Sequence, residues 1–280
     1  MEHITSTDID QTVDTVVTIG NFDGVHMGHR KLIETAKEYA EKLSLKLVVL
    51  TFNPHPMFVF GDRKNAALIM SPEEKCITME KMGVDTYIEY PFDREFASMS
   101  PEDFAIKLLF ERLRSKVVVV GYDYHFGSKQ KGDDKLLEKL GKEYGVKTVF
   151  IPKVIYEGSR VSSTRIRECI LNRDIDCADR LLTEPYFIVG RVEKGKRIGR
   201  TIGFPTANIL AHPDKLFPPN GVYATATVFK NKVYYSVTNV GYNPTVSGDH
   251  KTVETNLFDF DESIYGEEIT TYFFKWIRDE

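Results

Sequence analysis

The chain has 280 residues, of which 42% are hydrophobic and 12% aromatic, so it can bury a sizeable core in one large or two modest domains. Charged residues make up 28% and the formal net charge is -4, which gives no basic field to hold a polynucleotide and disfavours nucleic acid as a partner. No apolar run approaches the roughly 20 residues of a membrane helix, and the first residues carry no apolar leader, so we expect a cytoplasmic protein without a membrane partner.

The first half of the chain alternates short β-branched runs with longer amphipathic segments, which is typical of a parallel sheet covered by helices. The predicted strands are 15–19, 46–51, 84–89, 117–120 and 147–151, and the predicted helices are 28–43, 72–82, 101–113 and 133–144, followed by two short helices that end near Leu182. Ser71-Pro72 and Ser100-Pro101 each supply an N-cap serine and a first-turn proline. This half is therefore predicted to be α/β.

From Pro185 onward the pattern changes to apolar and polar residues in alternation, with Gly, Pro and Asn turns between the runs. The alternating runs are YFIVGRV, GVYATATVF, KVYYSVTNV and ETNLFDF. They predict a small antiparallel barrel or sandwich. The change of period predicts two domains, residues 1–184 and residues 185–280.

The three cysteines are Cys76, Cys169 and Cys177, and they are widely spaced with no C-x-x-C pair. Neither a disulfide framework nor a zinc site is indicated by this spacing. We therefore expect buried or idle thiols in a reducing compartment.

The segment after the first predicted strand is a glycine-rich turn that leads into a helix. Exposed backbone N–H groups and the positive helix end attract a phosphate, and histidine side chains three residues apart add directed hydrogen-bond donors. Attack on an α-phosphorus builds charge on its oxygens, and such donors stabilise that charge. The residues expected at the phosphate are Gly20, Asn21, Phe22, Asp23, Gly24, His26, Gly28 and His29. The alternatives are a plain turn with two surface histidines, or a zinc site, for which the local sequence holds no third ligand.

The string GNFDGVHMGH, residues 20–29, resembles the H-x-G-H signature of nucleotidyltransferases and the opening of bacterial riboflavin kinase/FAD synthetases. Three later segments are similar to the same family in the same order: TFNPHP at 51–56, GYDYHFG at 121–127 and VSSTRIR at 161–167. The resemblance implies a Rossmann-like domain that transfers AMP from ATP to FMN, giving FAD and pyrophosphate, with His26 and His29 as catalytic residues.

Each of these segments follows a predicted strand or begins a helix, which is the edge where open parallel sheets bind ligands. For the nucleotide, the resemblance favours Arg160, Ser163 and Thr164, with Arg167 as a further phosphate contact. For the flavin, the candidates are Asn53, His55, Asp123 and Phe126, the last within an aromatic turn that also holds Tyr122 and Tyr124. The alternatives are a capped helix with solvated arginines, and aromatic residues that belong to the core.

In the second half, residues 195–208 combine basic residues, glycines and a hydroxyl-amide pair suited to a nucleoside triphosphate. Oxygen ligands from Thr206 and Asn208 suit Mg²⁺. The string resembles the PTAN motif of riboflavin kinases, which adds Gly203 and Pro205 to the nucleotide site and implies a riboflavin kinase-like Greek-key β-barrel. The segment VETNL aligns Glu254 with the family's catalytic base; the alternative for this residue is an outward-facing strand position.

Three features depart from the family pattern. Asn256 stands where many relatives have histidine, LTEPY at 182–186 replaces the usual GRPY, and relatives continue beyond Glu280 into a helix that packs on the barrel. The shorter chain is expected to weaken or abolish the kinase activity. Our leading hypothesis is a bifunctional enzyme that takes ATP, Mg²⁺, riboflavin and FMN. The alternatives are a monofunctional FMN adenylyltransferase with an inactive kinase-like domain, and a non-catalytic flavin- or nucleotide-binding regulator; the sequence sets no oligomeric state.

Overall fold

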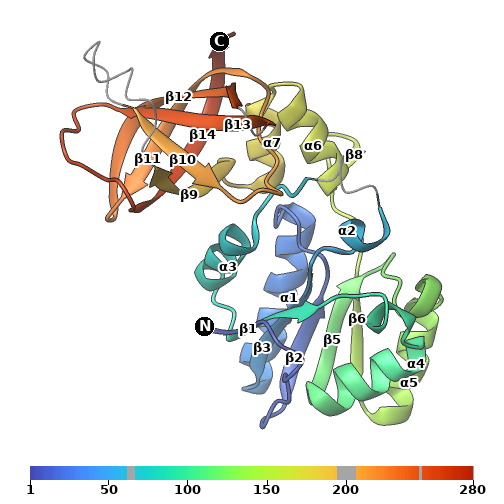
Figure 1. Cartoon of the computed structure of the whole chain (residues 1–280). Helices are drawn as coiled ribbons and strands as arrows, with labels where there is room; N and C mark the ends of the chain where they lie inside the picture. Colours follow the sequence, from blue (N-terminus) through green and yellow to red (C-terminus); the bar gives the residue numbers. More distant parts are fainter. Residues whose placement is uncertain (62–66, 194–205, 246–247, 280) are drawn as a thin grey trace. The chain divides into compact units, whose positions relative to one another are not determined.

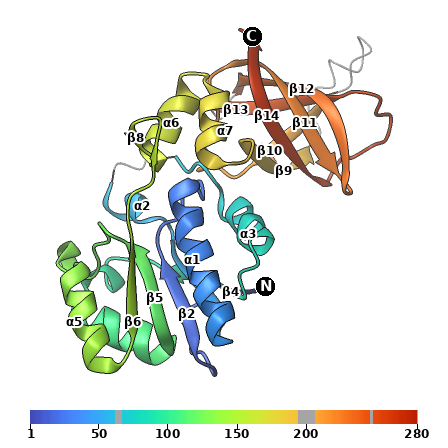
Figure 2. The same cartoon turned by 180° about the vertical axis from the view of Figure 1, so that it is seen from behind.

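The computed structural model describes residues 1–61, 67–193, 206–245 and 248–279, and Figures 1 and 2 show its elements from two sides. The chain forms two compact units, Met1–Ala66 with Lys75–Val161, and Ala67–Glu74 with Ser162–Glu280. These two units are defined by spatial contacts between residues. The predicted domain boundary between residues 184 and 185 is defined instead by the change of sequence periodicity. That boundary stays a prediction.

The first unit contains a six-stranded sheet in which every neighbouring pair of strands is parallel. In spatial order the strands are β1 (Glu2–Ile4), β4 (Thr86–Pro91), β3 (Lys46–Asn53), β2 (Thr15–Ile19), β5 (Ser115–Gly121) and β6 (Lys147–Ile151). The chain builds outward in one direction from β2 and in the other direction from β5. The carboxyl ends of β2 and β5 therefore flank the switch point where such sheets bind ligands. The predicted α/β class is confirmed.

Helices connect these strands. They are α1 (Met27–Leu43), α2 (Pro56–Phe60), α3 (Pro72–Lys81), α4 (Pro101–Asp103), which runs on into the π-helix η3 (Phe104–Arg112), and α5 (Asp134–Tyr144), with short 3₁₀ turns η2 (Phe96–Ser98) and η4 (Ser128–Gln130) and a hairpin of β7 (Ile155–Tyr156) and β8 (Ser159–Arg160). Ser100 caps α4 as predicted, because its Oγ accepts the Asp103 N–H at 3.0 Å. The short elements β1 and α2 were not predicted.

The second unit contains a closed six-stranded antiparallel barrel, drawn from dark yellow through orange to red in Figure 1. Its strands are β9 (Phe187–Glu193), β10 (Ala207–Ala211), β11 (Gly221–Phe229), β12 (Lys232–Thr245), β13 (Gly248–Leu257) and β14 (Glu268–Arg278). Strands β11, β12 and β13 are consecutive neighbours, and β14 returns beside β11, which is the Greek-key arrangement. The structure thus confirms the barrel over the sandwich. Helices α6 (Ser163–Leu171) and α7 (Ile175–Leu182) belong to the same unit, and α7 packs against β14.

Buried hydroxyls run through the barrel interior. Six side chains are joined by hydrogen bonds of 2.8 to 3.2 Å, in the order Thr271, Thr227, Ser236, Thr225, Thr238 and Thr255. Each buried hydroxyl thereby has a partner from a neighbouring strand. Because side chains alternate across a strand, the inward position of Thr255 turns Glu254 and Asn256 to the outer face of the barrel.

A buried ion pair ties the segment Ala67–Glu74 to the barrel within the second unit. The Lys215 Nζ lies 2.5 Å from Oε2 of Glu74 and also donates to the carbonyls of Ile69 and Phe187 at 2.6 and 2.8 Å. The other oxygen of Glu74 accepts the Val189 N–H of β9 at 2.9 Å. Both side chains are almost completely buried, and their charges are compensated by such partners within the protein, which include the Ser71 N–H, 2.9 Å from Oε2 of Glu74, and the Tyr186 ring, 4.4 Å from Nζ of Lys215.

Replacing Lys215 with methionine should destabilise the second unit by about 3–5 kcal/mol, because it leaves the Glu74 carboxylate buried without its cation. The single tryptophan, Trp276, lies on β14, so its fluorescence during urea unfolding reports on this unit. The double variant Glu74→Leu/Lys215→Met is the control, and it should lose less stability than Lys215→Met alone. Equal stability of Lys215→Met and the unmodified protein would contradict the role of the pair.

The structure joins Cys169 of α6 to Cys177 of α7 in a disulfide, with 5.9 Å between the two Cα atoms. This corrects the expectation that all three cysteines are idle thiols. A spacing of eight residues gives no sign of the pairing, because it depends on the turn that packs α6 against α7. Cys76 takes no part in a disulfide. In the described ranges, no helix is long and apolar enough to cross a membrane.

Candidate active site

The turn after β2 delivers two histidines to the start of α1. His26 is the N-cap residue of this helix, and its Nδ1 accepts the backbone N–H of His29 at 3.3 Å. Because Nδ1 acts as the acceptor, the neutral ring carries its proton on Nε2, which is left to donate to a ligand. A histidine therefore occupies the N-cap position, where Ser or Asp is common. The hydrogen bond that caps the helix also fixes the orientation of the His26 ring.

The two imidazole rings stack on each other, with centroids 3.7 Å apart and planes within 12°. Burial lowers the pKa of His26 to about 4, and the charge of Arg160 acts in the same direction. Burial, followed by repulsion from His26 and Lys75, holds the pKa of His29 well below its usual range. His29 is partly exposed as a residue, but its Nδ1 is buried without a hydrogen-bond partner in the described part of the chain. At neutral pH both rings are uncharged donors.

Two glycines allow this arrangement. Gly24 has φ of 87°, a conformation that glycine adopts without strain, and it turns the chain toward the helix. A Cβ on Gly28 would lie 3.2 Å from Cε1 of His26, so any side chain there would press on the ring. Of the other predicted residues in this turn, Phe22 and Asp23 are buried, and Phe22 packs edge-on against His29. Their roles as nucleotide contacts stay predictions.

The second strand at the switch point, β5, leads to Asp123. This carboxylate accepts a hydrogen bond from Arg160 Nη2 at 2.7 Å and lies 3.4 Å from Lys153 Nζ. Burial raises the pKa of Asp123, but the charges of Arg160 and Lys153 outweigh it and hold that pKa below its usual range. The structure thus brings Arg160 near both Asp123 and His26, as the predicted nucleotide site requires.

The corner after β3 carries the predicted flavin residues. Asn53 Nδ2 donates to Oε2 of the buried Glu89 at 3.0 Å, and His55 Nδ1 accepts the Met57 N–H at 3.1 Å, which caps α2. At the end of α2, Phe60 is 64% exposed and meets Phe92 edge-on. Phe60 was not among the residues predicted from the sequence, and its exposed ring makes it a further candidate at this corner.

Phe126 lies in the core rather than at the surface. It is 4% exposed and packs against Phe104 and Tyr124 in the cluster that fills one face of the sheet. Burial raises the pKa of Tyr124 far above its usual range, which agrees with that position. Tyr122, by contrast, is exposed. The arrangement matches the alternative that aromatic residues of this turn are core residues, and the Phe126 flavin contact stays a prediction.

The segment 162–167 starts α6 in the second unit. Ser162 is its N-cap residue and accepts the Arg165 N–H at 3.3 Å, so Ser163 and Thr164 occupy the first turn, where free N–H groups favour anions. Arg167 Nε donates to the Ala67 carbonyl at 3.1 Å. Gly203 and Pro205, predicted for the second nucleotide site, lie outside the described residues.

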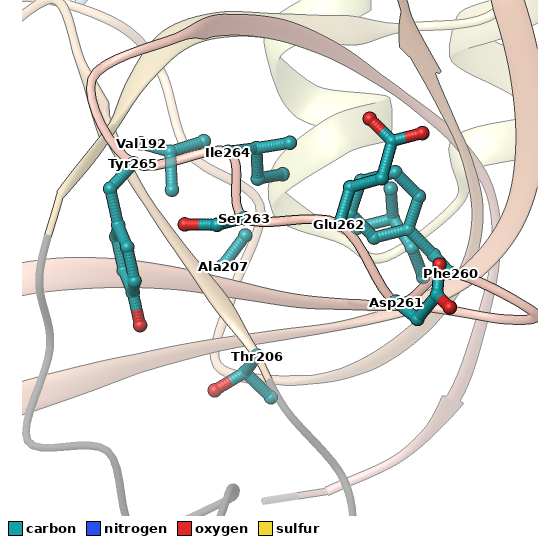
Figure 3. Close-up of a pocket in the computed structure, with 10 residues that line it drawn as sticks. Val192, Thr206, Ala207, Phe260, Asp261, Glu262, Ser263, Ile264 and Tyr265 are labelled. Carbon is teal, nitrogen blue, oxygen red and sulfur yellow. The ribbon is translucent and has the colours of Figure 1, made fainter.

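Two pockets of the barrel meet at Thr206. The first, with a volume of about 220 Å³, is lined by Val192, Thr206, Ala207, Leu257 and residues 260–265. Figure 3 shows Tyr265 on one side of it, Asp261 and Phe260 on the other, and Thr206 at its edge. The second, of about 280 Å³, is lined by Thr206, Val222, Val237, Asn239, Glu254, Asn256 and Arg278. Each is slightly smaller than the ~300–1,000 Å³ of most ligand sites.

The predicted kinase residues gather at this junction. Asn208 of β10 is paired in register with Glu254 of β13, and Glu254 with Asn239 of β12. Asn256 lies on the same outer face, and Arg278, which sequence reasoning missed, also lines the second pocket. Among the described residues, no three His, Cys, Asp or Glu side chains gather as a metal site. The Mg²⁺ expectation on Thr206 and Asn208 rests on hydroxyl and amide oxygens instead.

Two stacked histidines lie at a helix start beside the switch point of a parallel sheet, and a closed barrel carries a pocket lined by Glu254 and Arg278. This combination is typical of a two-part transferase that acts on phosphates. The family model for FAD synthetase matches residues 8–165, and the model for riboflavin kinase matches residues 182–280. The chain belongs to the bifunctional riboflavin kinase/FMN adenylyltransferase family. It is thus a transferase of FAD biosynthesis that carries the domain for each of the two activities.

Curated relatives cover nearly all of the chain. The bifunctional riboflavin kinase/FMN adenylyltransferase of Bacillus subtilis is 38% identical over 276 residues, which are 97% of this chain and 86% of the relative. The protein of the same name from Haemophilus influenzae is also 38% identical, over 94% of this chain and 86% of its own. A solved structure titled a macrolide-efflux protein from Streptococcus pneumoniae superposes with a TM-score of 0.88 at 34% identity, covering 100% of this chain and 92% of that one.

Proposed function

We propose that this chain makes FAD from riboflavin in two steps, with one site for each step. Riboflavin and ATP give FMN and ADP at the barrel pockets, and FMN and a second ATP give FAD and pyrophosphate at the histidine turn. The observation that carries the proposal is the pair of stacked, uncharged histidines held by the α1 cap. Both family models and the curated relatives support flavin synthesis rather than macrolide efflux.

At the first site, a phosphate oxygen of FMN attacks the α-phosphorus of ATP, and the bond from that phosphorus to the leaving pyrophosphate breaks. Negative charge shifts to the non-bridging and leaving oxygens. The Nε2–H of His26, the helix N-terminus and Arg160 are arranged to meet that charge. Neutral imidazoles suit this task, because they donate hydrogen bonds without needing a counterion in the apo enzyme.

At the second site, a ribityl hydroxyl of riboflavin attacks the γ-phosphorus of ATP, and ADP leaves. Glu254 accepts the hydroxyl proton as the new bond forms. Arg278 lines the same pocket and is placed to face negatively charged oxygens. Thr206 and Asn208 offer hard oxygen ligands beside Glu254, so they fit the Mg²⁺ that arrives with ATP; bound there, it would neutralise phosphate charge.

The test is an assay of the purified chain with MgATP and either riboflavin or FMN, in which FMN and FAD are followed separately. Both products from riboflavin are expected. FAD from FMN without FMN from riboflavin would show a monofunctional adenylyltransferase. If neither product forms, while the chain still binds flavin or nucleotide, the regulator alternative holds.

Phe60 is expected to stack on the flavin ring, because it is an exposed aromatic side chain at the end of the predicted flavin corner. Phe60→Ala should raise the KM for FMN about tenfold in adenylyl transfer, while the KM for ATP changes less than about twofold. Tyr235→Ala, which removes an exposed aromatic side chain of the barrel, is the matched control. Unchanged FMN affinity in Phe60→Ala would remove this residue from the site.

A further inference from the structure

Lys75 of α3 has a buried ammonium group in the first unit. The residue is 3% exposed, and its Nζ donates to the backbone carbonyl of Asn21 at 3.2 Å. The same carbonyl accepts from Thr51 Oγ1 at 3.2 Å. Asn21 belongs to the turn between β2 and the two histidines, so Lys75 holds the inner side of that turn from another element.

Two buried carboxylates compensate the charge of Lys75. Burial lowers the pKa of Lys75, and the charges of Asp23 and Glu89 oppose that effect. Asp23 is 1% exposed and lies in the histidine turn, and Glu89 is 2% exposed and lies on β4. Glu89 also accepts from Asn53, so this one cation connects the turn with the predicted flavin corner. An apolar side chain at position 75 could fill the same space without the cost of desolvating a charge. A stability argument alone therefore does not explain why a lysine is buried here.

The charge of Lys75 also acts on His29. It opposes protonation of that ring, after the larger effects of burial and of His26. The charged groups around the turn act in two steps. Lys75 on α3 acts on His29 and Arg160 on β8 acts on His26, whereas Asp23 in the turn and Glu89 on β4 act on Lys75, and Glu89 also lies 3.1 Å from Nε2 of His3. Without Lys75, one of the charges that oppose an imidazolium ion at His29 would be lost, and Asp23 and Glu89 would lose their buried cation.

We propose that Lys75 is a positioning residue for adenylyl transfer: it holds the Asn21 carbonyl and balances Asp23 and Glu89, so that His29 meets substrate phosphate as an uncharged ring. This inference rests on the proposed adenylyl transfer at the histidine turn. Lys75 affects the reaction indirectly, by holding the turn and by its charge. It is not one of the residues proposed to bind the substrate phosphates.

Three substitutions separate the hydrogen bond from the charge. Lys75→Met removes both, Lys75→Gln keeps a donor without charge, and Lys75→Arg keeps the charge. In Lys75→Met, the kcat/KM for ATP in FAD formation should fall about tenfold, and the KM for FMN should change less than about twofold. The acid limb of its pH profile should move up by about one unit, because the pKa of His29 rises when the cation is lost. Lys75→Gln should show the same pH shift with a smaller loss of rate, and Lys75→Arg should restore the original profile.

Lys81→Met is the control, because it makes the same change at an exposed position of the same helix; its rate and pH profile should match those of the unmodified protein. The riboflavin kinase rate, measured on each variant, reports whether the second unit is intact. An unchanged acid limb in both Lys75→Met and Lys75→Gln overturns the inference, and so does loss of the folded state in both, which would make Lys75 a purely structural residue. Failure of the unmodified chain to make FAD would instead refute the adenylyl-transfer proposal itself.

Discussion

Replacing His29 with alanine should lower the rate of FAD formation from FMN by about 10²–10³, the loss typical when a preorganised donor to a developing oxyanion is removed. The ring of His29 is packed between His26 and Phe22, so its loss also removes one side of the stacked pair. The measurement is the initial rate of FAD formation from supplied FMN and MgATP, compared with the unmodified protein.

Riboflavin phosphorylation in the same His29→Ala preparation is the internal control, and it should keep its full rate. Its proposed site is the barrel pocket that Glu254 and Thr206 line. A parallel loss of FMN formation and FAD formation would contradict separate sites. An unchanged rate of FAD formation would remove His29 from the chemistry.

The opposite result is expected for Glu254→Gln. The glutamine keeps the size of the side chain on the outer face of β13 but cannot accept the hydroxyl proton as a base. FMN formation from riboflavin should fall by about 10²–10⁴, the range for loss of a general base, while FAD formation from supplied FMN should be unchanged. The rates are measured with riboflavin alone and with FMN alone as acceptor.

Glu268→Gln provides the matched control, because Glu268 is an exposed carboxylate on β14 of the same barrel. It should leave both rates unchanged. Full-rate FMN production by Glu254→Gln would mean that another group accepts the proton. With the His29 result, the pair of substitutions would assign each activity to its own site in one intact chain.

Much of the fold follows from local patterns. The strands β2 and β6 have the predicted bounds. In β2, which is buried along its whole length, a continuous β-branched run marks a strand covered on both faces. Ser100 caps α4 because serine followed by proline is a local signal that needs no tertiary partner. The turn between β2 and α1 was likewise predicted, because glycines and histidines between a strand and a helix favour phosphate, and its phosphate site stays a prediction.

The features missed by the sequence reasoning depend on contacts between distant residues. Lys75 and Glu74 look like ordinary surface charges of a helix, and only the folded chain shows that each is buried with partners such as Asn21 and Lys215. Phe126 alternates with other aromatics in a turn, and that pattern fits a core position and a ligand contact equally well. The bond between Cys169 and Cys177 depends on how two short helices pack.

The ion pair of Glu74 and Lys215 sets a condition for anyone who wishes to divide this protein. A fragment that starts at Pro185 would contain Lys215 but lack Glu74, because that carboxylate comes from the first half of the sequence. In such a fragment, either water would have to reach the buried ammonium of Lys215, or the residues around this ammonium would not pack. The barrel strands follow one another in sequence, but the unit they belong to also includes the segment that carries Glu74. A chimera with another N-terminal domain would therefore need a carboxylate in the place of Glu74.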